Sequence, residues 1–128
     1  METIFLHSDI TSAVIKAYYT VYNKLGYGFL EKVYENALII ELVKMGLECA
    51  TQKQISVFYD KIKVGLYYSD IIINNSVIVE IKAAEILCEA HEAQLINYLK
   101  ATDIEVGLLL NFGKKAAFVR KIFSNNNK

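Results

Sequence analysis

The sequence predicts an α/β domain with a mixed central sheet flanked by helices, and two observations lead to this fold class. Some segments repeat apolar residues every three or four positions, which is typical of amphipathic helices. Others are rich in β-branched and aromatic residues and alternate with a period of two, which is typical of strands. Along the chain the segments follow the order α, α, β-meander, α, β, β. This order favours a sheet packed against helices.

The first two helices are marked by their ends. Either Ser8 or Asp9 is a good N-cap for the first helix, and Gly26 follows its last apolar position. A second helical pattern starts just after Gly28 and continues to Gly46, a residue suited to a helix C-terminus.

Strand patterns begin near Ile55, turn at residues 60–61 and continue to Tyr68. The run DIIINNSVIVEIK supplies two further strand segments around a turn at Asn74, Asn75 and Ser76. These segments predict a β-meander.

The last third of the chain predicts a helix over roughly residues 87–102, then a strand at VGLLLNF and another at AAFVRKIF. The apolar VGLLLNF run predicts burial on both faces. The closing SNNNK is polar, and we expect a flexible tail over residues 124–128. There is no proline and no repeat, so residues 1–128 are predicted to form a single domain.

Composition fits this prediction, because 128 residues that are 54% hydrophobic can bury one substantial core. No run approaches the ~18 apolar residues of a membrane span. METIFLHSDITS has no basic region followed by an apolar core, so we expect a soluble cytoplasmic protein with no membrane partner. Cys49 and Cys88 lack zinc-like spacing and are expected to be small buried apolar residues.

Charge is balanced overall, which argues against a protein that holds nucleic acid by bulk electrostatics. All 14 acidic residues lie at or before Glu105, so the segment after it is purely basic. That segment is either a phosphate-facing strip or a solvated tail and an edge strand protected by lysines.

The hairpin within DIIINNSVIVEIK brings charged residues together if its loop is the three residues 74–76. Asp70 then lies directly opposite Glu80, and Lys82 lies two residues further on the same face. A two-residue loop would instead set Asp70 against Val79, so the prediction depends on the register.

Two carboxylates directly opposite each other destabilise a sheet, so we expect a cation to compensate the charges of Asp70 and Glu80. Mg²⁺ or Mn²⁺ is suitable, because such ions take oxygen ligands and can bind a substrate phosphate. Lys82 would then contact the phosphate or the attacking water. The alternative is a solvated polar face, in which Lys82 pairs with Glu80 and Asp70 ends a strand.

The second helix carries Glu31 in its first turn, with Tyr34 and Glu35 one turn later on nearby faces. An acidic residue at that position also suits the helix dipole, which is the ordinary structural explanation.

The third helix places Gln94 and Tyr98 on one face, with His91 one turn before. The alternatives are a core role for Tyr98 and a local hydrogen bond for His91.

Together these residues form recognisable motifs: GxxExxY at Gly28, Glu31 and Tyr34; D…ExK at Asp70, Glu80 and Lys82; and QxxxY at Gln94 and Tyr98. The chain resembles the GxxExxY family of the PD-(D/E)XK nuclease-like superfamily from about the first helix through LLLNFG. One departure is Tyr68, where many relatives carry an arginine. Arg120 is the chain's single arginine, which suggests that phosphate binding rests on lysines.

The resemblance implies a restriction-endonuclease-like fold with a core of α-β-β-β-α-β order. It implies metal binding by Asp70, Glu80, Ile81 and Glu31, with Lys82 as the catalytic lysine. Gln94 and Tyr98 would lie beside the active site and help to position the substrate.

The predicted function is a nuclease that hydrolyses DNA with a Mg²⁺- or Mn²⁺-activated water, with RNA as the alternative substrate. The alternative function is a catalytically silent nucleic-acid-binding or assembly module, which the neutral charge and small size favour. A homo-oligomer is a further expectation, because nine tyrosines are available for surface patches, although tyrosines fill cores as readily.

Overall fold

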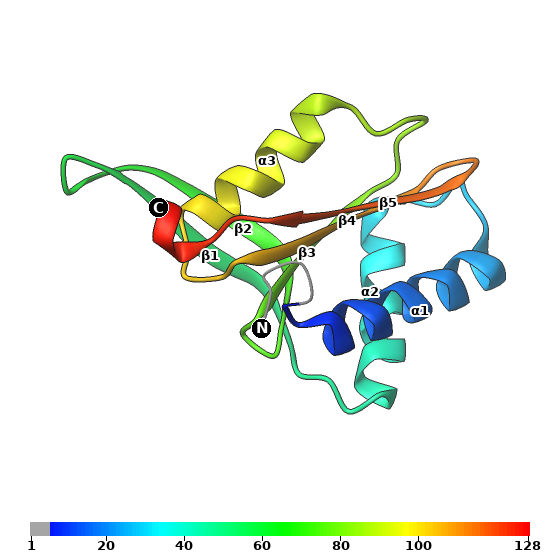
Figure 1. Cartoon of the computed structure of the whole chain (residues 1–128). Helices are drawn as coiled ribbons and strands as arrows, with labels where there is room; N and C mark the ends of the chain where they lie inside the picture. Colours follow the sequence, from blue (N-terminus) through cyan, green and yellow to red (C-terminus); the bar gives the residue numbers. More distant parts are fainter. Residues whose placement is uncertain (1–5) are drawn as a thin grey trace.

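A computed structural model describes residues 6–128 (Figure 1). Its elements are α1 (Ser8–Leu25), α2 (Glu31–Lys44), β1 (Cys49–Tyr59), β2 (Ile62–Ile73), β3 (Val77–Lys82), α3 (Glu89–Lys100), β4 (Val106–Phe112), β5 (Ala116–Ile122) and a short 3-10 helix, Asn125–Asn127. The predicted order of helices and strands is confirmed.

The strands form one five-stranded sheet in the order β1-β2-β3-β4-β5. Strands β3 and β4 are parallel, and every other neighbouring pair is antiparallel, so the predicted mixed sheet is confirmed. The parallel pair needs a crossover connection, and α3 supplies it. Figure 1 shows α3 on one side of the sheet and α1 with α2 on the other.

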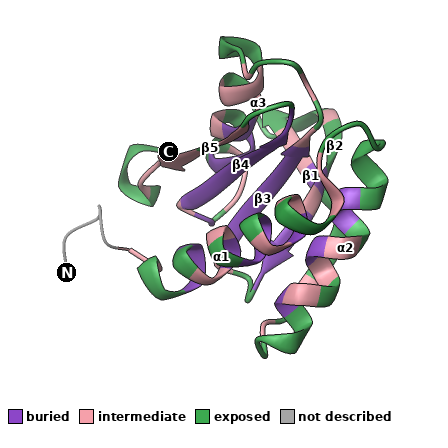
Figure 2. Cartoon of the chain, turned by 90° about the vertical axis from the view of Figure 1, so that its right-hand side faces the viewer, coloured by how far each residue is buried: buried purple, intermediate pink, exposed green. Residues whose placement is uncertain are grey.

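Each face of the sheet carries its own apolar cluster. Residues of α1 and α2, such as Val14 and Leu38, pack on one face, and residues of α3, such as Leu95 and Leu99, pack on the other. All seven residues of β4 are buried, as VGLLLNF predicts, because helices cover both faces and strands flank both edges. Figure 2 shows the burial concentrated along β3 and β4.

Two tyrosines of α1 tie this helix to the far end of β4. The Tyr18 hydroxyl donates to the carbonyl oxygen of Asn111 and accepts from the Ala117 N–H at 3.0 Å. Burial raises the pKa of Tyr18 to about 12. The Tyr22 hydroxyl donates to the Gly113 carbonyl oxygen at 2.6 Å. These bonds fix where β4 ends relative to the helix layer.

Strand β2 differs from the sequence prediction, because it runs without a break from Ile62 to Ile73. The predicted separate segments are joined, because β1 pairs with β2 on both sides of Asp70.

The closing residues contact the loop before β4, and the flexibility expected for residues 124–128 stays a prediction. The Lys128 ammonium donates to the carbonyl oxygens of Thr102 and Ile104 at 2.7 and 2.8 Å, and the Asn125 N–H donates to a carboxylate oxygen of Glu105 at 2.9 Å. The end of the chain is thereby attached to the loop between α3 and β4.

The expectation of two buried cysteines was wrong. Cys49 is half-buried and Cys88 is exposed. Cys88 is the N-cap of α3, and its N–H donates to the His91 ring at 3.2 Å. This is the local hydrogen bond that we considered for His91.

Within residues 6–128, no helix is both long and apolar enough to cross a membrane. The first five residues of METIFLHSDITS lie outside the described residues.

Candidate active site

The hairpin between β2 and β3 has the register on which the predicted site depends. Ile73 pairs with Val77 and Ile72 with Ile78, which leaves residues 74–76 as the loop. Asn74 and Asn75 adopt left-handed backbone conformations with φ of 49° and 52°. Asparagine tolerates this conformation better than most residues, so the sequence favours the turn at this point.

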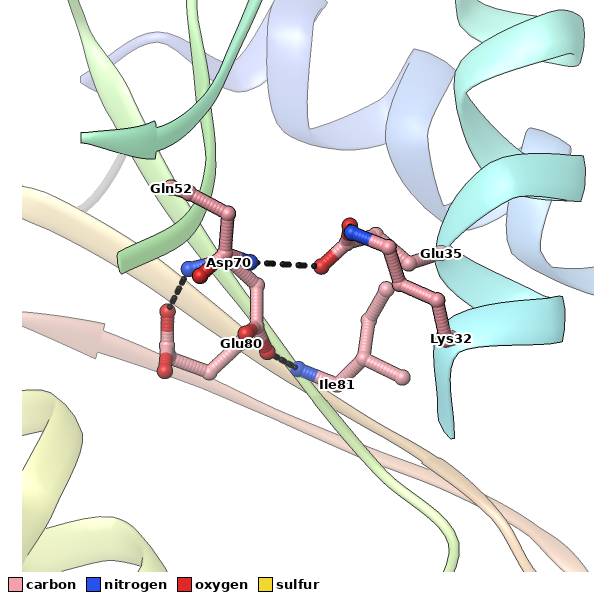
Figure 3. A network of polar contacts seen from close by, with 6 residues as sticks. All are labelled: Lys32, Glu35, Gln52, Asp70, Glu80 and Ile81. Atoms are coloured by element: carbon pink, nitrogen blue, oxygen red, sulfur yellow. Dashed lines mark hydrogen bonds and ion pairs between the residues drawn. The ribbon is translucent and has the colours of Figure 1, made fainter. Parts of the chain in front are cut away.

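Beyond the last regular pair, side chains replace the backbone ladder between β2 and β3. The Asp70 N–H donates to Oε2 of Glu80 at 2.8 Å, and the Ile81 N–H donates to Oδ2 of Asp70 at 2.8 Å (Figure 3). Each carboxylate therefore bridges to the backbone of the opposite strand. Asp70 and Glu80 are adjacent, as the three-residue loop requires.

A backbone irregularity lies where Asp70 leaves the ladder. Gln52, which faces Asp70 on β1, has a left-handed φ of 50° and is missing from the regular pairs. Tyr67 and Ile72 both face α3, although residues five apart in a regular strand point to opposite sides. The alternation of side chains along β2 therefore shifts by one residue around Asp70. This shift places Asp70 between the two helix layers.

Burial raises the pKa of both carboxyl groups. Glu80 is 3% exposed, and its desolvation together with the nearby charge of Asp70 raises its pKa to about 8. The pKa of Asp70 is also raised, mainly by burial and further by Glu35 and Glu31, against a lowering by the Ile81 N–H. With a pKa of about 8, Glu80 is largely protonated at neutral pH.

Lys82 lies in a chain of polar contacts that reaches α3. Its ammonium donates to the Gln94 amide oxygen at 3.0 Å, and the Gln94 amide nitrogen donates to the Tyr98 hydroxyl at 3.0 Å. Among the described residues Lys82 forms no ion pair, so the alternative of a Lys82–Glu80 pair is wrong. Tyr98 is also part of the core, and burial followed by the charge of Glu80 raises its pKa.

On the α2 side, the structure brings Glu35 to the site. Glu35 is 4% exposed, accepts from the Lys32 ammonium at 2.5 Å, and accepts from the Gln52 amide at 3.2 Å (Figure 3). The sequence prediction chose Glu31, which is exposed at the first position of α2. Glu35 is one helical turn further along, and this spacing is the signal in the sequence for its position near Asp70.

Asn111 is a further residue that the sequence prediction missed. It is the β4 partner of Lys82, and its side-chain amide holds the Ala84 N–H at 2.9 Å and the Ala84 carbonyl oxygen at 3.0 Å. These two hydrogen bonds fix the backbone directly after Lys82. Its signal is a single polar residue in an otherwise apolar strand.

A family model described as the PD-(D/E)XK nuclease superfamily matches residues 8–122. The chain belongs to this superfamily.

A crystal structure of SSO0001 shares the fold of this PD-(D/E)XK chain. The TM-score is 0.55 at 20% sequence identity, and the match covers 73% of this chain and 50% of that chain. The chain therefore corresponds to about half the length of SSO0001. No curated protein matches it significantly.

The tyrosine and the glycine of the GxxExxY motif have structural roles before α2. Tyr34 is fully buried, donates to the Gly26 carbonyl oxygen at 2.6 Å, and accepts from the Phe29 N–H at 3.2 Å. Gly28 has a φ of 110°, which side-chain-bearing residues rarely adopt. The tyrosine and the glycine shape the loop that leads into the acidic face of α2.

PD-(D/E)XK nucleases generally use divalent metals, and the donors present here fit such an ion. Among residues 6–128 no group of three or more His, Cys, Asp or Glu side chains forms a ready-made cage. Mg²⁺ needs none, because it is usually held by one or two carboxylates with water and substrate phosphate. Each carboxylate uses one oxygen to accept a backbone N–H, Oδ2 of Asp70 and Oε2 of Glu80. Ile81 can offer only its backbone carbonyl, which in a strand lies on the same side as its N–H.

Proposed function

We propose that this PD-(D/E)XK chain is a Mg²⁺- or Mn²⁺-dependent nuclease that hydrolyses phosphodiester bonds in DNA. The observation that carries the proposal is the contact between Asp70 and Glu80 beside Lys82, which is itself hydrogen-bonded to Gln94. We also propose membership of the GxxExxY family within the superfamily, on the motifs alone.

Each residue of the site has a proposed role in hydrolysis. Asp70, Glu80 and the Ile81 carbonyl would hold the ion, which when bound supplies an activated water and charge for the developing transition state. Lys82 holds the phosphate or the attacking water, and Gln94 fixes where its ammonium points. Tyr98 in turn orients Gln94.

The α2 carboxylates act at the rim of this site. Both raise the pKa of Asp70, and Glu35 has the larger effect. We propose that Glu35 stabilises the bound ion, directly or through water, and that exposed Glu31 contributes from further out.

A cleavage assay tests the proposal. Single- and double-stranded DNA are incubated with the protein and Mg²⁺, Mn²⁺ or EDTA, and RNA is included as a separate substrate. We expect cleavage that needs the ion and falls by about 100-fold or more in Asp70→Asn and Lys82→Met. Asp9→Asn and Lys16→Met, exposed on α1, are the matched controls. Cleavage that persists in Asp70→Asn or Lys82→Met would reject the site.

A catalytically silent nucleic-acid-binding module is the second candidate. It is favoured by a specific observation: each carboxylate already accepts a backbone N–H, so the site is satisfied without an ion. Salt-dependent DNA binding without metal-dependent turnover would support the module. Mn²⁺ binding that is lost in Asp70→Asn would favour the nuclease.

A further inference from the structure

A groove lies between the β1–β2 hairpin and α3, next to the candidate active site. It has a volume of about 800 Å³, which is within the range of ligand-binding clefts. The hairpin contributes Phe58 and Tyr67 to its lining, and α3 contributes Gln94, Asn97, Tyr98 and Lys100. In Figure 1 the hairpin extends past the end of α3 that carries the later residues.

The lining combines exposed aromatic rings with neutral polar groups. Phe58 is 62% exposed and Tyr67 is 49% exposed, so their rings are open to a ligand. The Tyr67 ring lies 5.8 Å from that of Tyr98, which gives the wall a second ring behind the first. Among residues 6–128, no acidic side chain lines the groove, and Lys100 is the one cationic side chain that does.

The groove is continuous with the catalytic side chains. Gln94 and Tyr98 line it, and the same Gln94 accepts the hydrogen bond from Lys82. A nucleic-acid strand bound in the groove would therefore extend along α3 to the position where Lys82 would contact a phosphate.

We propose that this groove binds unpaired nucleotides, whose bases stack on Tyr67 and Phe58, so that the substrate is single-stranded DNA or RNA. The inference rests on the proposed function and names its substrate class. Aromatic rings contact a base face only when the base is unstacked, which excludes the interior of a duplex. One lysine in the groove and a neutral net charge also provide little electrostatic attraction for the phosphates of a duplex.

The test measures binding in EDTA, so that it does not depend on cleavage. Fluorescence anisotropy follows labelled oligo-dT and oligo-rU of about 15 nucleotides, within the range of single-strand site sizes, and a DNA duplex of equal length. We expect both single strands to bind more tightly than the duplex. If only one binds, that strand type is the substrate and the groove assignment stands.

Tyr67→Ala is expected to weaken single-strand binding by about tenfold, the loss of one stacked base, whereas Tyr67→Phe retains it. Tyr68→Ala is the matched control, because Tyr68 is the next residue, is 48% exposed and does not line the groove. Phe58→Ala with Tyr59→Ala as its control repeats the comparison, and circular dichroism checks the fold of each variant.

The groove assignment is overturned if the duplex binds as tightly as the single strands, if no oligonucleotide binds, or if groove and control variants behave alike. Its failure is separable from that of the proposed function. Wild-type protein that binds single strands with the expected variant pattern but never cleaves them with Mg²⁺ or Mn²⁺ supports the groove and rejects the nuclease.

Discussion

Glu80 links the chemistry of the site to the stability of the protein. Its pKa is raised to about 8 in the folded state, against an ordinary value of 4.5. Between these pH values the folded state binds more protons than the unfolded state, so the free energy of unfolding falls as pH rises. We expect a fall on the order of 1 kcal/mol per pH unit in metal-free buffer, and its loss in Glu80→Gln.

Urea unfolding in EDTA at about pH 5, 7 and 9 measures this dependence in both proteins. The same slope in Glu80→Gln as in the wild type would show that another group is responsible. Divalent ions should restore wild-type stability most at the highest pH, because they bind the ionised carboxylate.

Glu35 yields a second prediction at the scale of a residue. Glu35→Gln keeps the size and the hydrogen-bonding capacity of the side chain but removes a charge next to the carboxylate pair. We expect Mn²⁺ affinity to fall about tenfold, the effect of losing a supporting group around a metal. Isothermal titration calorimetry measures it. The control is Glu41→Gln, because Glu41 pairs with Lys44 at 3.2 Å on the same helix; equal affinities in the two variants would contradict a role for Glu35.

The residues of the site were predictable to different degrees, for physical reasons. Asp70 and Glu80 could be placed together because strand alternation and a turn of known length fix their register. Glu35 could not be placed, because it meets the site through a hydrogen bond from the Gln52 side chain. Gln52 has a left-handed backbone, and glutamine carries no signal for that conformation. Asn111 shows the same limit, since its partner is the backbone of Ala84 rather than another side chain.

At the scale of elements, the approach of β4 to the chain after β3 depends on Gly113. A Cβ at this position would lie 2.5 Å from the Ala84 carbonyl oxygen and 2.9 Å from the Asn111 amide nitrogen. Gly113→Ala should therefore force the Asn111–Ala84 bonds apart. We expect the free energy of unfolding to fall by about 1–3 kcal/mol. The proposed nuclease activity should fall with it, because Lys82 lies directly before the segment that the Asn111–Ala84 hydrogen bonds hold.

Chemical denaturation of Gly65→Ala provides the comparison for this change. The nearest atoms to a Cβ at Gly65 are 3.5 and 3.8 Å away, which is ordinary contact, so its stability should change by less than about 1 kcal/mol. If both variants lost the same free energy of unfolding, the effect would come from replacing glycine in or next to a strand and not from the Asn111–Ala84 hydrogen bonds.

Helix and strand existence could be predicted because periodicity reports which face is buried. Contacts distant in sequence decided the rest. Lys128 donates to the carbonyl oxygens of Thr102 and Ile104, and nothing in SNNNK indicates these contacts. Cys88 is exposed because it starts α3, and its type alone favours burial.

At the scale of the whole molecule, one sheet is shared by two apolar clusters. Val79 and Ile81 of β3 face α1 and α2, whereas Ile78 faces α3. The carboxylates of the candidate active site lie where the regular backbone pairing between β2 and β3 ends. The site thus combines groups from both layers: Glu35 from α2 and Gln94 from α3.

This shared sheet predicts that the two layers unfold together. Leu38 of α2 and Leu99 of α3 are both fully buried, one in each cluster. Leu38→Ala and Leu99→Ala should each lower the free energy of unfolding by about 2–5 kcal/mol and keep a single transition. Neither layer can separate without exposing the apolar face of β3 and β4. Circular dichroism and tyrosine fluorescence during thermal unfolding should coincide in both variants. A second transition in Leu99→Ala alone would instead show that α3, with the groove beside it, opens as an independent unit.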